Sequence, residues 1–219
     1  MTVTARDSGG AAPPRQPLVF VLGDSISMHY GPYLKEFLAP VFRYARKGDG
    51  VAAGDLDNAS GANGGDSDAC LAYIEKVFGG PDAPRDLFLW NCGLHDVKTT
   101  DSGRQVPLDR YRRNLEAGAE RIRGAGARLA WVRTTAALEA IHNARHVGFR
   151  RFHRDVIAYN EAADDVMRRA GASAIDLYGF TLPFGEAAYC DHVHFTGEVR
   201  RLQAAFIAGH LWPLSGRAP

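Results

Sequence analysis

The sequence predicts a single-domain, three-layer α/β/α sandwich with a five-stranded, mostly parallel sheet. Short apolar runs of four to six residues alternate with longer segments in which apolar residues recur every three or four positions. No linker divides the chain after residue 17, and no internal repeat is visible. Alternating strands and helices of these lengths are typical of a parallel sheet that is covered on both faces.

The first predicted strand is the apolar run Leu18–Leu22, which stops at Gly23-Asp24-Ser25. So short an apolar run is typical of a buried parallel strand, and open α/β sheets place their chemistry at the carboxyl ends of such strands. Ser25 is therefore a candidate nucleophile. The alternative is that Asp24 and Ser25 only cap the helix that follows.

The same two patterns predict the remaining elements in order. Short apolar runs predict strands at 41–46, 86–90, 129–132 and 172–177, and a Gly-, Asp- and Asn-rich stretch predicts a loop at 48–65. Helical spacing predicts helices at 30–38, 71–78, 107–125, 156–170 and 196–211. We expect the last helix to bury Leu202, Phe206 and Leu211.

The composition fits one globular domain and argues against two classes of partner. With 219 residues, 46% of them hydrophobic, the chain can bury a well-covered core. A formal net charge of +1 gives no general attraction to nucleic acids or anionic membranes. No segment approaches the roughly 18 apolar residues of a membrane span. We therefore expect no nucleic-acid partner and no membrane partner.

The N-terminal residues and the cysteines bear on the cellular compartment in which we expect the protein. Residues 1–16 are rich in Ala, Gly and Pro and lack the apolar core of a signal peptide, so we expect a disordered tail there and the domain over 17–215. Cys70, Cys92 and Cys190 are too few for a disulfide scaffold and match no zinc spacing. They favour a reducing, cytoplasmic location, with Cys92 and Cys190 as small buried packing residues.

A second candidate cluster, Asp191-His192-Val193-His194, lies near the carboxyl end of the chain. A serine hydroxyl becomes a good nucleophile when a neutral imidazole accepts its proton, and a carboxylate is needed to orient that imidazole. Asp191 and His194 supply these two groups. The alternative is a surface turn in which Asp191 caps the last helix and the histidines have no catalytic role.

Four short blocks follow one another along residues 18–210: Gly23-Asp24-Ser25, Gly65-Asp66-Ser67, Asn91-Cys92-Gly93-Leu94-His95-Asp96 and Asp191-His192-Val193-His194. In order and spacing they resemble the SGNH hydrolases, also called the GDSL-like esterase family. The resemblance implies a flavodoxin-like SGNH fold, a catalytic triad of Ser25, His194 and Asp191, and no metal or other cofactor. It also implies an oxyanion hole in which the N–H groups of Ser25 and Gly65 take part. The alternative for Gly65 is a flexible turn before a helix.

The third block departs from the family's usual Gly-x-Asn-Asp pattern, because His95 stands where an asparagine is expected. Asn91 resembles an Asn-x-Gly variant of the block, and an amide donates at any pH whereas an imidazole depends on its protonation state. We therefore favour Asn91 as the side-chain oxyanion donor and keep His95 as the alternative donor. Their structural alternatives are a strand-end turn for Asn91 and a helix cap for His95.

Residues 139–154 carry four arginines and three histidines, and they leave the carboxyl end of a predicted strand at the edge of the sheet where Ser25 lies. Arginine forks suit carboxylates and phosphates, which points to an anionic substrate. The candidate substrate-binding residues are Arg145, Arg150 and Arg151, together with Asp24 beside the nucleophile. The alternative, a solvated loop and a charged helix start, is the commoner situation for such a segment.

These residues together predict a serine esterase that hydrolyses a small acyl ester, such as an acetyl ester, through a covalent acyl-enzyme. The expected substrate is a small molecule, a glycoside or another metabolite ester. The main alternative is an acyltransferase that uses the same triad with an acceptor other than water. Two further alternatives are a binding module without turnover and a metallohydrolase built from Asp191, His192 and His194 with His95 and Asp96.

Overall fold

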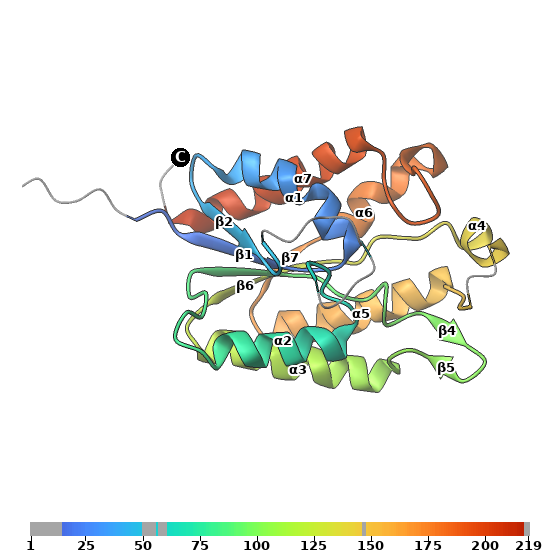
Figure 1. Cartoon of the computed structure of the whole chain (residues 1–219), viewed down its shortest axis with the longest axis horizontal. Helices are drawn as coiled ribbons and strands as arrows, with labels where there is room; N and C mark the ends of the chain where they lie inside the picture. The colour runs from blue at the N-terminus through green and yellow to red at the C-terminus, as the bar shows by residue number, and fades with distance from the viewer. Residues whose placement is uncertain (1–14, 50–55, 57–60, 146–147, 217–219) are drawn as a thin grey trace, which may run out of the picture.

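The computed structural model describes residues 15–49, 56, 61–145 and 148–216. Within them, five strands form one sheet in the order β2-β1-β3-β6-β7, and every pairing in it is parallel. The strands are Leu18–Leu22 (β1), Arg43–Arg46 (β2), Leu87–Trp90 (β3), Arg128–Val132 (β6) and Ser173–Ile175 (β7). The predicted five-stranded α/β/α sandwich is confirmed (Figure 1).

Helices cover both faces of the sheet (Figure 1). One layer contains α1 (Ser25–Leu38), α6 (Leu177–Thr181) and α7 (Gly197–Leu211), and the other contains α2 (Ser67–Phe78), α3 (Leu108–Gly124) and α5 (His153–Arg169). Strand residues alternate between the layers: Leu87 and Leu89 pack with α1 and α7, whereas Phe88 and Trp90 pack with α2, α3 and α5. Burial on both sides explains why these strands are continuous apolar runs.

The elements that the sequence patterns miss are short ones. The hairpin of Thr99–Thr100 (β4) and Gly103–Arg104 (β5) and the helix Glu139–Ala144 (α4) are too brief to show an apolar period. Both lie beyond the carboxyl ends of the strands, on the right of Figure 1. Most of the loop predicted at 48–65 lies outside the described residues.

Two side chains that we expected to be buried are exposed. Leu202 of α7 is 44% exposed, because α7 turns Ala204 and Ile207 instead towards the core that it shares with α1. Cys190 is exposed in the loop before α7, whereas Cys92 is buried after β3. Among the described residues, no helix is long and apolar enough to cross a bilayer.

The turn after β3 depends on Gly93. Its φ of +149° is a backbone conformation that residues with a Cβ rarely adopt, and a Cβ here would collide with Thr134 Oγ1. Thr134 follows β6 and donates through this hydroxyl to the Cys92 carbonyl oxygen at 2.9 Å. The segments that leave β3 and β6 can therefore run in contact at the edge of the sheet where the candidate residues lie.

Asp96 connects the segment after β3 to the start of α2. Its Oδ1 accepts a hydrogen bond from the Ser67 N–H at 2.9 Å, and its side chain is fully buried. Burial raises the pKa of Asp96 to about 8, although the hydrogen bonds from Ser67 act in the opposite direction. The folded protein therefore holds the Asp96 proton far more tightly than the unfolded chain does.

We expect Asp96→Asn to become more stable relative to the wild type as the pH rises from about 5 to about 8. Because the folded-state pKa lies above the ordinary 3.8, the stability that protonated Asp96 contributes is lost as the pH rises towards 8. The neutral amide keeps an oxygen acceptor for Ser67 and does not titrate. Urea unfolding of both proteins across this range measures the difference, and a change of less than about 1 kcal/mol would contradict the expectation.

Candidate active site

Ser25 is the first residue of α1, and only Gly23 and Asp24 separate it from the carboxyl end of β1. Asp24 caps the helix, since its Oδ1 accepts a hydrogen bond from the Ile26 N–H at 3.0 Å. Gly23 leaves room for this turn, because a Cβ there would lie 2.8 Å from the Ser27 Cβ. The cap predicted as an alternative role for this block is therefore real, and it fixes Ser25 at a helix N-terminus, where partial positive charge favours a developing anion.

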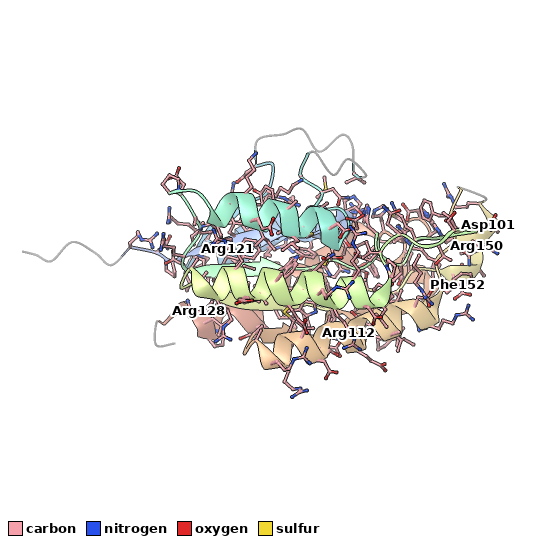
Figure 2. All side chains as sticks on the ribbon, turned by 90° about the horizontal axis from the view of Figure 1, so that it is seen from below. Asp101, Arg112, Arg121, Arg128, Arg150 and Phe152 are labelled. Carbon is pink, nitrogen blue, oxygen red and sulfur yellow. The ribbon has the colours of Figure 1, made fainter. Side chains whose placement is uncertain are left out.

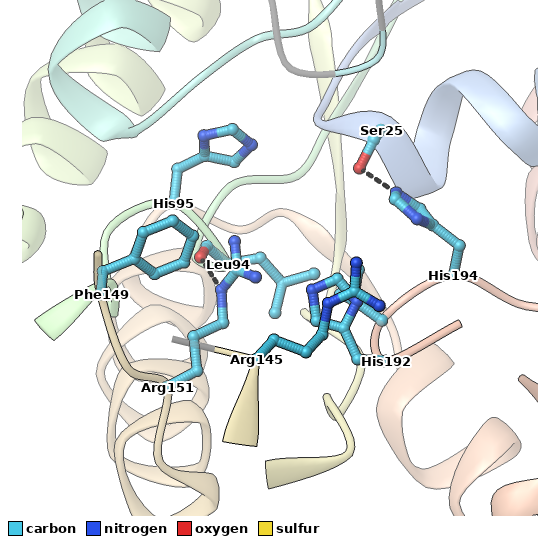
Figure 3. Close-up of a pocket in the computed structure, with 9 residues that line it drawn as sticks. Ser25, Leu94, His95, Arg145, Phe149, Arg151, His192 and His194 are labelled. Carbon is cyan, nitrogen blue, oxygen red and sulfur yellow. Dashed lines mark hydrogen bonds between the residues drawn. The ribbon is translucent and has the colours of Figure 1, made fainter. Parts of the chain in front are cut away.

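The loop before α7 brings an imidazole to Ser25 from 169 residues further along the chain (Figure 3). His194 Nε2 lies 2.8 Å from Ser25 Oγ, and His194 Nδ1 lies 2.7 Å from Asp191 Oδ2. The three residues that the resemblance assigns to a triad thus form one continuous chain of hydrogen bonds. In this geometry the imidazole can accept the hydroxyl proton while the carboxylate orients it.

Asp191 is held as an anion. Its Oδ1 accepts hydrogen bonds from the backbone N–H groups of Val193 at 2.8 Å and His194 at 2.7 Å. Burial alone would raise the pKa of Asp191, but these bonds and the one from the His194 ring lower it to about 2. The carboxylate is therefore charged at any pH near neutrality, as an orienting and stabilising group for an imidazolium must be.

His29, which the sequence analysis did not single out, packs against the His194 ring. The two ring centroids are 4.7 Å apart. Burial and the nearby Arg200 together lower the pKa of His29 to about 4, so the ring beside His194 is neutral near pH 7. A signal was present in the sequence: His29 stands four residues after Ser25 and so lies on the same face of α1.

The structure does not bring Asn91 to the nucleophile. Its amide donates to the Val132 carbonyl oxygen at 2.8 Å and lies 3.4 Å from Thr134 Oγ1. Asn91 lines a small separate cavity with Asp24, whereas His95 lines the pocket that contains Ser25 (Figure 3). The preference for Asn91 over His95 does not fit this geometry, because the Asn91 amide is directed towards the end of β6.

Gly65 lies in a loop that is bonded to the nucleophile turn. The neighbouring Gly64 N–H donates to the Gly23 carbonyl oxygen at 2.8 Å, and the Gly65 N–H donates to Asn63 Oδ1 at 2.7 Å. Lys47 also contacts this loop, since its Nζ donates to the Asn63 carbonyl oxygen at 2.6 Å. The Gly65 N–H is thus near the turn but already has an acceptor.

A pocket of about 220 Å³ opens in front of Ser25 (Figure 3). Of the four candidate substrate-binding residues, Arg145 and Arg151 line it. Arg150 instead lies 3.5 Å from Asp101, which stands between β4 and β5 (Figure 2). Asp24 lines the separate small cavity. The pocket is lined by Ser25, Leu94, His95, Arg145, Phe149, Arg151, His192, Val193 and His194.

The two histidines of the last block diverge. His194 reaches Ser25, whereas His192 stacks on the buried ring of His142 with a centroid distance of 4.7 Å and an angle of 8° between the rings. In the part of the chain that the structure describes, no group of three or more His, Cys, Asp or Glu side chains is arranged to hold a metal ion. The metallohydrolase alternative therefore gains no support from the arrangement of these side chains.

No protein-family model matches the sequence, and no curated protein is similar to it at the level of sequence. Solved structures do resemble its fold. A lipase/acylhydrolase from Enterococcus faecalis has a TM-score of 0.66 at 17% identity, over 89% of this chain and 95% of that one. A GDSL-like lipase from Bacteroides thetaiotaomicron has a TM-score of 0.67 at 18% identity, over 91% and 90%.

An acetyl xylan esterase has a TM-score of 0.65 at 16% identity, over 90% of this chain and 98% of its own. At these identities the likeness concerns the arrangement of strands and helices and extends over nearly the whole of each chain. The chain therefore has the fold of the GDSL-like lipases and SGNH acylhydrolases.

Proposed function

We propose that this protein is a serine ester hydrolase of the SGNH type, which cleaves a small acyl ester through a covalent acyl-enzyme. The observation that carries the proposal is the hydrogen-bonded chain from Asp191 through His194 to Ser25 at the mouth of a pocket. The likeness in fold to esterases and acylhydrolases supports it. A cytoplasmic location stays a prediction from the sequence.

In the first half-reaction, Ser25 Oγ attacks the ester carbonyl carbon while its proton passes to His194 Nε2. Asp191 stabilises the resulting imidazolium through Nδ1. The tetrahedral intermediate then collapses, the bond to the alcohol oxygen breaks, and His194 donates its proton to that oxygen. In the second half-reaction, water attacks the acyl carbon while His194 takes a proton from it. The second tetrahedral intermediate then collapses, the bond from the acyl carbon to Ser25 Oγ breaks, and His194 returns the proton to Ser25 Oγ as the carboxylic acid leaves.

The oxyanion needs donors on the side of the carbonyl away from His194. The Ser25 N–H is in the first turn of α1 and so has no acceptor within the helix. We assign the side-chain donor to His95, which shares the pocket with Ser25. The Asn63 amide donates to His95 Nε2 at 3.4 Å, which places the imidazole proton on Nδ1. The Gly65 N–H would join them only by giving up its bond to Asn63 Oδ1.

The size of the pocket supports a small substrate. Its volume of about 220 Å³ is below the range of about 300–1,000 Å³ in which drug-sized ligands are usually held. A short acyl group fits this space better than a long fatty acyl chain. The acyltransferase alternative uses the same residues, and it stays a prediction that the yield of a new ester with an added alcohol would test.

We expect a fluorophosphonate to label Ser25, and Ser25→Ala to lose the label and at least about a hundredfold of kcat on short esters. Ser27→Ala is the matched control, because the Ser27 hydroxyl donates to the Asp24 carbonyl oxygen at 2.6 Å and does not contact His194. Peptide mapping should still find the label on Ser25 in that variant. Labelling of the wild type at another residue, or hydrolysis that survives in Ser25→Ala, would refute the proposed function.

We expect His95→Ala to lower kcat and Asn91→Ala to lower stability. Removing one oxyanion donor costs about 10²–10³ in kcat, so His95→Ala should lower kcat by this amount with little change in KM. Asn91→Ala removes the bond to Val132 and should cost about 1–3 kcal/mol of stability while kcat remains close to the wild type.

Steady-state kinetics and urea unfolding of the two variants make this comparison. His95→Asn serves as a further control, because its amide can donate from the same position and should recover part of the activity that His95→Ala loses. If Asn91→Ala shows the larger fall in kcat, the oxyanion role belongs to Asn91.

A further inference from the structure

The pocket in front of Ser25 carries two guanidinium groups, and none of the described residues that line it is an aspartate or glutamate. Figure 3 shows the side chains of Arg145 and Arg151 extending into it from the segment that follows α4. Arg150, between them in sequence, lies elsewhere and contacts Asp101. The placement of charge in the pocket is therefore specific to two of the three arginines.

Arg151 is built into the wall of the pocket. It is only 6% exposed, its Nε donates to the Leu94 carbonyl oxygen at 2.8 Å, and its guanidinium lies 5.0 Å from the centre of the Phe149 ring. These contacts fix the Arg151 guanidinium in the wall of the pocket. Leu94 directly precedes His95, so the contact places Arg151 next to the proposed oxyanion donor.

Arg145 supplies the second charge from the C-cap of α4. Within the described part of the chain it makes no ion pair with a carboxylate, whereas Arg150 does. Asp191, the carboxylate nearest in sequence to the pocket histidines, is engaged with His194 and with two backbone N–H groups. The Asp191 carboxylate is therefore engaged with groups other than Arg145.

The pKa values of the stacked His142 and His192 respond to the positive charge of the same arginines. Burial, together with the charges of Arg151, His192, Arg145 and Lys98, lowers the pKa of His142 to about 4. Burial also lowers the pKa of His192; Asp191 opposes this, and Arg145 and Arg151 reinforce it. Both imidazole rings are thus uncharged near pH 7, and the positive charge of the pocket comes from the arginines.

On the basis of the hydrolase function proposed above, we propose that the substrate is a small ester bearing a carboxylate or phosphate group, which Arg145 and Arg151 hold beside Ser25. A guanidinium fork matches the geometry of either oxyanion and binds it with charge-assisted hydrogen bonds. Leu94 and Phe149 provide apolar contact for the rest of the substrate. A neutral acyl chain would instead cover the Arg145 guanidinium without offering it an oxyanion.

Three matched pairs of esters test this proposal and distinguish the two oxyanions. The para-nitrophenyl monoester of succinate is compared with para-nitrophenyl butyrate, which places a carboxylate on the acyl side. O-acetylglycolate is compared with its methyl ester, and acetylglycerol phosphate with acetylglycerol, which places a carboxylate or a phosphate on the alcohol side. We expect at least one anionic ester to exceed its neutral partner by about tenfold or more in kcat/KM.

The variants assign this preference to residues. In Arg145→Gln the preference should fall to about unity, because KM should rise more for the anionic ester than for its neutral partner. Arg145→Lys should keep part of the preference, since it retains the charge without the fork. Arg150→Gln, the matched control, should keep all of it because Arg150 does not line the pocket.

If no anionic ester exceeds its neutral partner in kcat/KM in any of the three pairs, the proposal is overturned. An anionic preference that survives in both Arg145→Gln and Arg151→Gln would also overturn it; if Arg151→Gln does not fold, Arg145→Gln decides alone. If no ester is hydrolysed and Ser25 takes no label, the hydrolase function has failed, and calorimetric titration with succinate and inorganic phosphate tests the anion site separately. Binding that Arg145→Gln weakens about tenfold would support the site, and absent or unchanged binding would refute it.

Discussion

The hydrogen bond between Ser25 and His194 joins the first strand of the sheet to its last loop, and the two ends of the chain must be held together for it to form. The helices that carry these ends, α1 and α7, pack side by side on one face of the sheet (Figure 1). The loop itself is fixed by backbone bonds, from the Cys190 N–H to the His194 carbonyl oxygen at 2.8 Å and from the Leu138 N–H to the His192 carbonyl oxygen at 2.9 Å. The position of His194 is therefore a property of the whole fold.

Charge in the site is divided between groups that are fixed as ions and groups that are kept neutral. Asp191 has its pKa lowered to about 2 and is an anion, while burial lowers the pKa of His29 and of His142 to about 4 and keeps both rings uncharged. His29 contacts the His194 ring and His142 stacks on His192, while His194 Nε2 lies 2.8 Å from Ser25 Oγ. This arrangement suits a base that must gain and lose a proton in each cycle while its surroundings do not change charge.

The sequence predicted what depends on periodicity and missed what depends on the direction of single side chains. Alternation of short apolar runs with helical spacing was sufficient for the order of strands and helices, because each element buries a regular stripe. The contact of Ser25, His194 and Asp191 was anticipated from the chemistry of these residue types and from the resemblance of four blocks to the SGNH hydrolases, since only Ser25 directly follows a predicted strand. Leu202, by contrast, fits the helical period of α7 but lies on its solvent side, which only the packing against α1 decides.

The same limit explains the oxyanion donor and the arginines. Asn91 and His95 lie in one block, and whether a side chain points to Ser25 or to Val132 depends on the turn at Gly93, which the residue types do not reveal. Arg150 and Arg151 are consecutive in an extended segment, so their side chains point to opposite sides, one to Asp101 and one into the pocket.

The bond from the Leu138 N–H to the His192 carbonyl oxygen has a consequence for how this fold can change. It joins the segment that enters α4, and so the helix that ends at Arg145, to the loop that carries His194. A change in the backbone of α4 therefore acts on the position of His194 as well as on Arg145. Altered selectivity is therefore more accessible through single side chains on an unchanged backbone than through loop grafting.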